Sequence, residues 1–323
     1  MKKNSIPFLG KFFDVAEKAR AEENSKTPFE KDVKITSNVV YKTVNDENLY
    51  IDIYEPSVNH SNPLPAVLVI PGGGWMVKNR TRRKGYASLL AYLGAKVFVI
   101  DYRVTPYVRF PENLKDVIDA LNYISDRKDE FNIDVNNVVI TGDSAGGHLT
   151  ACLACVCTTP GYADKLNLYK PSVTPVGCMF ISGSFSLDAM NGRIPCTHFL
   201  LSRHFSGFRT KTGFKKWALH NEAHPWNCIT ENFPPSFNSG GKTDVFCKGD
   251  AVTMANKLSE KNVKNKVFVG TSRHCDHCYI YRLPYLWARH DMYKLLAWYA
   301  ELEQTLNVDM SEQLEKEAEF LMH

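Results

Sequence analysis

A serine between glycines is the residue whose setting most clearly suggests chemistry. Ser144 lies at the centre of a Gly-x-Ser-x-Gly pattern that spans residues 142–146. The apolar run 138–141 precedes this pattern, and the helix-prone run 149–156 follows it. A serine on a sharp turn between a strand and a helix is exposed, and the helix N-terminus directs its N–H groups towards it. The pattern therefore predicts a nucleophilic serine in preference to an ordinary turn.

Three consecutive glycines, Gly72 to Gly74, follow the apolar run 66–70. Backbone N–H groups of glycine can approach a ligand closely because no Cβ stands in the way. We expect N–H groups of this glycine loop and the N–H group of Ala145 to bind the negative oxygen that develops on an attacked carbonyl group, as an oxyanion hole. A phosphate-binding loop is the competing interpretation. The stretch lacks the Gly-Lys-Ser/Thr ending of a P-loop and the spacing of a dinucleotide fingerprint.

These motifs are similar to those of α/β-hydrolases in the hormone-sensitive-lipase-like and bacterial esterase/acetylesterase group. The similarity rests on the loop 72–75, on Asp101-Tyr102-Arg103 and on the stretch 142–147, and it extends over roughly residues 40–302. It implies an α/β-hydrolase fold and hydrolysis of carboxylic esters through a Ser-His-Asp triad and an acyl-enzyme, with no cofactor. Pro71 stands where the group often has His, and the resemblance implies that Gly73 and Gly74 still supply the N–H donors of the oxyanion hole. Similar loops that start with Pro occur among acetylesterase-like members, which favours short acyl groups.

The resemblance also implies the triad order Ser, Asp, His. Asp244, on a loop after the run 236–239, resembles the acid of the Gly-x-x-Asp segment. Asp250 is the second candidate, but we expect it to be the N-cap of a helix that begins near residue 248. The base is His277 or His274, and the small and aromatic residues that follow His277 favour that histidine.

The run His274-Cys275-Asp276-His277-Cys278 also contains metal-ligating side chains. Adjacent residues rarely surround one tetrahedral ion, so we expect no metal there. We interpret His148 as a helix-packing residue, and Cys152 and Cys155 as buried core cysteines. An amidase or formamidase of the same fold is an alternative function, because ester and amide hydrolysis use one constellation. A non-catalytic binding protein that retains the fold is a less favoured alternative.

The elements that must position these residues follow an α/β pattern. Two opening strands, 34–42 and 49–54, are expected to pair antiparallel across a turn at 45–48. From residue 66 onward, apolar strands alternate with helices, which predicts a mostly parallel sheet with helices on both faces. We expect a single domain over residues 1–323, with a helical N-terminal extension over residues 1 to about 34.

An insertion at about 184–233 breaks this alternation, and we expect it to form a lid over the carboxyl ends of the strands. It is rich in aromatic residues: Phe185, Phe199, Phe205, Phe208, Phe214, Trp217 and Trp226. It is also interrupted by basic residues: Arg193, Arg203, Arg209, Lys211, Lys215 and Lys216. Such a segment is not typical of a lid that inserts into a lipid interface.

The amino-acid composition indicates which binding partners and which cellular compartment to expect. The 323 residues include 39 basic and 35 acidic ones, a balance that does not favour nucleic acid. We expect a small-molecule ester substrate, no membrane span and no signal peptide. The 9 scattered cysteines favour reduced thiols and a cytoplasmic location. The basic cluster within residues 78–84 is expected to be a solvated helix start, and the oligomeric state is open.

Overall fold

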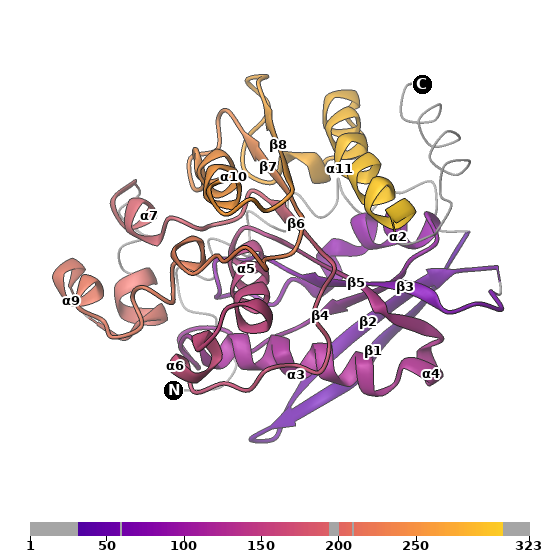
Figure 1. The fold of residues 1–323 in the computed structure, drawn as a ribbon, viewed down its shortest axis with the longest axis horizontal. Helices are drawn as coiled ribbons and strands as arrows, with labels where there is room; N and C mark the ends of the chain where they lie inside the picture. The colour runs from indigo at the N-terminus through magenta and orange to yellow at the C-terminus, as the bar shows by residue number, and fades with distance from the viewer. Residues whose placement is uncertain (1–31, 59, 194–199, 209, 306–323) are drawn as a thin grey trace.

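The computed structural model describes residues 32–58, 60–193, 200–208 and 210–305 (Figure 1). Its strands form one sheet in the order β1-β2-β4-β3-β5-β6-β7-β8. The strands are β1 (Val33–Val44), β2 (Glu47–Pro56), β3 (Leu64–Ile70), β4 (Lys96–Ile100), β5 (Ile133–Asp143), β6 (Gly177–Ile181), β7 (Ser236–Gly241) and β8 (Asn265–Gly270). β2 is antiparallel to β1 and β4, and all other pairs are parallel. The expected fold class is confirmed.

Helices cover both faces of the sheet (Figure 1). On one face lie α2 (Lys84–Tyr92) and α11 (Leu286–Thr305), and on the other lie α3 (Glu112–Asp126), α5 (Ala145–Thr158) and α10 (Asp250–Glu260). The shorter elements are η1 (Arg80–Arg83), α4 (Lys128–Phe131), α6 (Tyr162–Lys165), α7 (Leu187–Arg193), η2 (Leu200–Phe205), α9 (Lys211–Lys215), η3 (Pro225–Asn227) and η4 (Tyr279–Tyr281).

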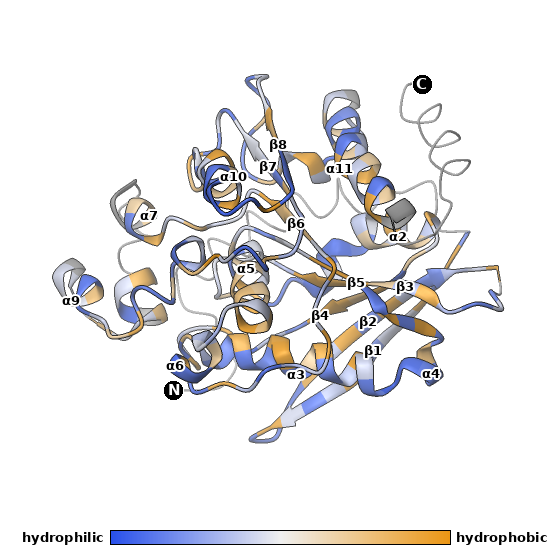
Figure 2. Ribbon diagram, in the orientation of Figure 1, coloured by the Kyte–Doolittle hydropathy of each residue, from blue (hydrophilic) through white to orange (hydrophobic). Residues whose placement is uncertain are grey.

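Each face of the sheet has its own apolar core. Successive side chains of a strand point to opposite faces, so Leu68 of β3 joins the core under α3 and α5, while Val67 and Val69 join the core under α2 and α11. Helix α3 alternates apolar and hydrophilic stretches in Figure 2, as a helix with one buried side does. This double burial is why β3 and β6 are continuous apolar runs and why β4 is apolar after Lys96.

The ends of several elements differ from the expected ones. β1 begins at Val33, so the last two residues of the expected helical extension are strand, and residues 1–31 lie outside the described residues. β5 begins at Ile133, five residues before the expected start at 138, and its pairing with β3 shifts register after Pro65. α5 begins at Ala145, directly after the serine.

The expected lid contains α7, η2, α9 and η3, and no strand occurs in its described part. α7 and α9 are both drawn at the left of Figure 1. Phe199 and Arg209, both counted in the composition of this segment, lie outside the described residues. In the ranges that the structure describes, none of the helices is both long and apolar enough to cross a bilayer.

Candidate active site

Ser144 occupies a strained turn between β5 and α5. Its backbone has φ 50° and ψ −121°, a conformation that non-glycine residues rarely adopt. The turn brings the chain so close to β3 that a Cβ on Gly146 would lie 1.9 Å from the Ile70 carbonyl oxygen. The Ser144 N–H donates to the Ile181 carbonyl at 3.0 Å, which ties the turn to β6. This geometry is the expected strand–turn–helix setting, and Ser144 is half-buried in it.

His277 lies between Ser144 and Asp244. Its Nε2 is 2.8 Å from Ser144 Oγ, and its Nδ1 is 2.9 Å from Asp244 Oδ2. The three residues follow the carboxyl ends of β5, β7 and β8, and such ends meet at one edge of a parallel sheet. The other Asp244 oxygen accepts the N–H groups of Phe246 and Cys247, both at 2.9 Å, which fixes the carboxylate. The structure thus brings together the three residues that the sequence placed far apart.

The histidine and the aspartate stabilise each other's charged form. Burial of the ring acts to lower the pKa of His277, but the Asp244 carboxylate, together with Cys278 and Cys247, raises that pKa well above its usual value. Burial acts to raise the pKa of Asp244, but the His277 charge and the two backbone N–H groups lower that pKa below its usual value. The pair can therefore hold a proton taken from the serine hydroxyl.

His274, the other candidate base, is placed elsewhere. Its ring is exposed and stacks on Trp287, with 6.0 Å between the ring centroids. Cys275 is buried in the core, and Asp276 forms an ion pair with Arg282 at 2.8 Å. The side chains of the run 274–278 therefore point to different surroundings and do not surround a common point.

Asp250 has a role that the sequence did not indicate. The N-cap of α10 is Gly249, with φ 81°, so the expectation that Asp250 is the N-cap is wrong. Asp250 is buried in the first helical turn, and its Oδ2 accepts the N–H groups of Phe185 and Ser186, both at 2.8 Å. These two donors lie at the start of the segment 184–233, so Asp250 anchors the start of that segment to α10. The anchor needs tertiary contact and leaves no local signal.

The glycine loop takes backbone conformations that favour glycine. Gly73 has φ 127° and Gly74 has φ 59°. Two buried side chains hold the loop from outside: Asn79 Nδ2 donates to the Gly72 carbonyl at 2.9 Å, and the Tyr102 hydroxyl donates to the Pro71 carbonyl at 2.8 Å. Sequence reasoning assigned no role to Asn79 or Tyr102. The third expected donor, the N–H of Ala145, lies at the N-terminus of α5, where it has no acceptor within its own helix.

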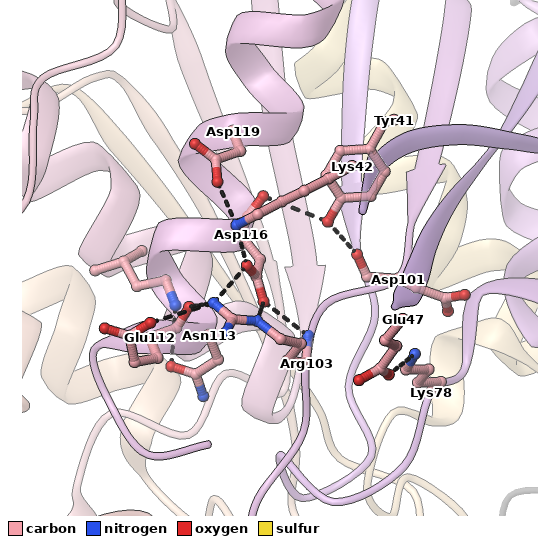
Figure 3. Close-up of polar contacts among 11 residues, drawn as sticks. Tyr41, Lys42, Glu47, Lys78, Asp101, Arg103, Glu112, Asn113, Asp116 and Asp119 are labelled. Atoms are coloured by element: carbon pink, nitrogen blue, oxygen red, sulfur yellow. Dashed lines mark hydrogen bonds and ion pairs between the residues drawn. The ribbon is translucent and has the colours of Figure 1, made fainter. Parts of the chain in front are cut away.

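The stretch that carries Tyr102 is held by ion pairs (Figure 3). Arg103 Nε and Nη2 donate to the two oxygens of the buried Asp116 on α3, at 2.8 and 2.9 Å. Lys42 of β1 contacts the same carboxylate and that of Asp119. These contacts join the end of β4 to α3 and β1, and thereby fix the backbone from which Tyr102 reaches the glycine loop.

The basic cluster after this loop is only partly solvated. Arg80 and Arg83 are buried, at 6% and 3% exposure, which contradicts the expected solvated helix start for these two residues. Arg80 pairs with Asp52 and Asp101. Arg83 pairs with Asp143, the residue before the serine. Buried arginines require carboxylate partners, and those partners come from distant strands.

His148 packs as expected, one turn after the serine. Its Nε2–H donates to the Ala223 carbonyl at 2.8 Å, and burial lowers the pKa of this histidine to about 4, so the ring is neutral. Trp75 lies against it, with 5.4 Å between ring centroids, and Phe205 of η2 lies 4.9 Å from Trp75, again between ring centroids. Trp75 is 1% exposed and has φ 57°. An aromatic wall therefore stands beside the first turn of α5.

Comparisons with known proteins agree with this architecture. The BD-FAE family matches residues 51–258, more than half of the chain. Neutral cholesterol ester hydrolase 1 of Bos taurus is 32% identical over 231 residues, covering 62% of this chain and 55% of that protein. Esterase LipC of Mycobacterium tuberculosis is 35% identical over 118 residues, covering 36% of this chain and 29% of that protein. The chain thus spans roughly half or less of the length of these curated relatives.

Solved structures show the same fold at low sequence identity. Esterase B from Lactobacillus rhamnosis, inhibited by a C6-C4 SN3 compound, superposes with a TM-score of 0.79 at 20% identity, over 94% of this chain and 96% of that one. An esterase from Pyrobaculum calidifontis gives a TM-score of 0.69 at 19% identity, over 91% and 92% of the two chains. The resemblance to esterases with the α/β-hydrolase fold is thereby confirmed, and the chain belongs to the BD-FAE family.

Proposed function

We propose that this protein is a carboxylic ester hydrolase that uses Ser144 as nucleophile, His277 as base and Asp244 as the group that orients the base. The observation that carries the proposal is the unbroken line of contacts from Ser144 Oγ through His277 to Asp244, at 2.8 and 2.9 Å. The esterases among its relatives and structural neighbours support the same reaction class.

The reaction follows from the placement of these groups. Ser144 Oγ attacks the acyl carbon while His277 Nε2 takes its proton, and Asp244 stabilises the imidazolium that forms. The N–H groups of Gly73, Gly74 and Ala145 stabilise the oxyanion, by several kcal/mol for such donors. His277 then protonates the leaving alcohol, and an acyl-serine remains. A water molecule activated by His277 releases the acid and restores the serine.

Short acyl groups are the proposed substrates. Trp75 and Phe205 form the aromatic wall beside the first turn of α5, directly after the glycine loop, and bulky side chains there limit the length of an acyl chain. One similar solved structure, esterase B, is described with a C4-C4 tributyrin phosphonate inhibitor. The substrate class we propose is therefore esters with acyl groups from acetyl to butyryl, and the alcohol portion is open.

An amidase or formamidase is the second candidate, because the same three residues serve amide hydrolysis. A fluorophosphonate probe followed by peptide mapping tests for a reactive Ser144, and Ser144→Ala is the control that should not be labelled. Turnover of p-nitrophenyl acetate beside the matching p-nitroanilide then separates ester from amide preference. Absence of labelling and of turnover in folded wild-type protein would leave a non-catalytic binding protein as the better interpretation.

A further inference from the structure

A second cluster of metal-ligating side chains lies in the lid, apart from Ser144, His277 and Asp244. Asp188 comes from α7, while His220 and His224 come from the turn between α9 and η3. One ligand atom from each lies within 4.8 Å of the others. His220 Nε2 is 3.1 Å from Asp188 Oδ1, and His224 Nε2 is 3.9 Å from Asp188 Oδ2. Both imidazoles therefore direct the same ring nitrogen at one carboxylate.

A backbone hydrogen bond fixes the orientation of the His224 ring. Its Nδ1 lies 2.6 Å from the His220 carbonyl oxygen, and because a carbonyl only accepts, Nδ1 carries the proton and Nε2 carries the lone pair. A backbone carbonyl on the far ring nitrogen is the outer-shell arrangement typical of metal-binding histidines. The Asp188 N–H is 3.3 Å from this lone pair, a long contact that a cation can replace.

The spacing of the three atoms suits one small divalent ion. Tetrahedral zinc with bonds of about 2.0–2.1 Å separates its ligands by about 3.3 Å. The nitrogen-to-carboxylate separations, 3.1 Å from His220 to Oδ1 and 3.9 Å from His224 to Oδ2, lie on either side of that value, and one ligand atom from each residue lies within 4.8 Å of the others, so side-chain rotations would bring them into place. The Asp188 side chain is 42% exposed and that of His224 is 4% exposed, which leaves the outer side open to a water ligand. Two imidazoles, one carboxylate and one water form a common zinc ligand set.

We propose that Asp188, His220 and His224 bind a zinc ion that clips the two ends of the lid together. The site joins α7, whose approach is held by Asp250, to the 220–224 turn, whose Ala223 carbonyl binds His148 of α5. In the metal-free state the His220 Nε2–H donates to Asp188. Zinc takes the other neutral tautomer, with the proton on Nδ1. The ion would thus fix the lid against α5 and take no part in the attack on the ester.

A second group of side chains could also bind zinc, and the experiment must distinguish the two sites. Asp244, Cys247 and His277 also have ligand atoms within 4.8 Å of one another, and zinc bound there would occupy the base and inhibit hydrolysis. The two clusters differ in ligand chemistry, because only the second contains a thiol. Cobalt(II), which replaces zinc in tetrahedral sites, gives an intense sulfur-to-metal charge-transfer band only when a thiolate is a ligand.

The test uses the full chain, freed of metal with a chelating resin. Zinc binding is measured by calorimetry and by elemental analysis after dialysis, and cobalt(II) is added to a second portion for its absorption spectrum. We expect about one zinc per chain, a rise in melting temperature on zinc addition, and a tetrahedral cobalt spectrum without a thiolate band. His220→Ala and Asp188→Asn, which alter partly exposed side chains, should weaken zinc binding about 100-fold or more. The matched controls His274→Ala and Cys247→Ser should bind zinc as the wild type does.

Three results would overturn the proposal: no zinc above background in folded wild-type protein, wild-type affinity in both His220→Ala and Asp188→Asn, or loss of binding in Cys247→Ser together with a thiolate band in the cobalt spectrum. Circular dichroism of each variant verifies the fold. His224 is buried, so His224→Ala is interpreted only if its spectrum matches that of the wild type. None of these readouts depends on ester hydrolysis, so failure of the metal site leaves the proposed function unaffected.

Discussion

Arg83 donates two parallel hydrogen bonds to Asp143, the residue before Ser144: Nε to Oδ1 at 2.7 Å and Nη2 to Oδ2 at 2.6 Å. Both side chains are buried, and the Tyr281 hydroxyl donates to the same carboxylate at 3.2 Å. The carboxylate also lies under the glycine loop, because a Cβ on Gly72 would come within 2.4 Å of Oδ2. This pair therefore connects η1, the serine turn, the glycine loop and the segment after β8.

Arg83→Ala should destabilise the fold strongly, because it leaves the Asp143 carboxylate buried without its cation. Breaking one side of a buried ion pair costs about 3–5 kcal/mol. Urea denaturation followed by circular dichroism measures the loss. Lys78→Ala is the matched control from the same basic stretch, since Lys78 forms a largely exposed pair with Glu47 and should cost about 1 kcal/mol or less. Equal losses in the two variants would show that the Arg83 pair contributes no more than a surface contact.

Ser144→Ala should abolish ester hydrolysis and leave stability nearly unchanged. The substitution removes one hydroxyl group and keeps a Cβ at a position whose strained backbone is set by its neighbours. Purified variant and wild type are compared for turnover of p-nitrophenyl acetate and for melting temperature. Residual activity above a few per cent of wild type would indicate another nucleophile.

His277→Ala and His274→Ala should differ widely in activity. Loss of the true base reduces kcat by about 10⁴-fold or more, because triad residues act as a unit. His274 stacks on Trp287 at the surface, so its loss should change kcat less than about threefold, within the range of ordinary surface substitutions. Steady-state kinetics of both variants on one ester measures the difference, and the reverse ranking would assign the base to His274.

Local patterns in the sequence predicted only part of this arrangement. The serine turn and the glycine loop could be identified because each is specified within a few residues by glycines and a flanking strand. Asn79 and Tyr102 could not, because their function depends on carbonyl groups that the fold brings to them. Arg83 was wrongly expected at the surface, since its partner Asp143 is 60 residues away in sequence. The cluster of Asp188, His220 and His224 could not be predicted either, because Asp188 and His220 are 32 residues apart in sequence.

The pH dependence should reflect the Asp244 charge. His277 must be neutral to accept the serine proton. Burial acts to lower the pKa of His277, but Asp244, with Cys278 and Cys247 beside it, raises that pKa well above its usual value. Activity should therefore rise with pH, with the midpoint of the acidic limb of kcat/KM above about 6.5, the ordinary histidine value. Asp244→Asn removes the charge, so the limb should move to lower pH while kcat falls by about 10⁴-fold. The role of Asp244 would be contradicted if the midpoint of the wild-type acidic limb lay at or below the ordinary histidine pKa. It would also be contradicted if that midpoint moved to higher pH in Asp244→Asn.

The aromatic wall should set the length of acyl chain that the enzyme accepts. Each methylene that fits a pocket adds about 0.8 kcal/mol of binding, whereas one that meets Trp75 or Phe205 adds strain. For the wild type we expect kcat/KM on p-nitrophenyl esters to peak between acetyl and butyryl and to fall steeply by octanoyl. Trp75→Ala should raise the octanoyl-to-acetyl ratio of kcat/KM about tenfold, as two accommodated methylenes would.

Removal of a buried tryptophan costs about 3–5 kcal/mol of stability, so the Trp75→Ala profile is measured well below the melting temperature of the variant. Trp287→Ala is the matched control, because Trp287 stacks on His274 and Tyr285, away from the glycine loop, and its loss should leave the chain-length profile unchanged. A wild-type profile that rises through decanoyl, or activation at an oil–water interface, would contradict the short-acyl proposal and favour a lipase. A Trp75→Ala profile identical to that of the wild type would instead show that the acyl chain extends away from the wall.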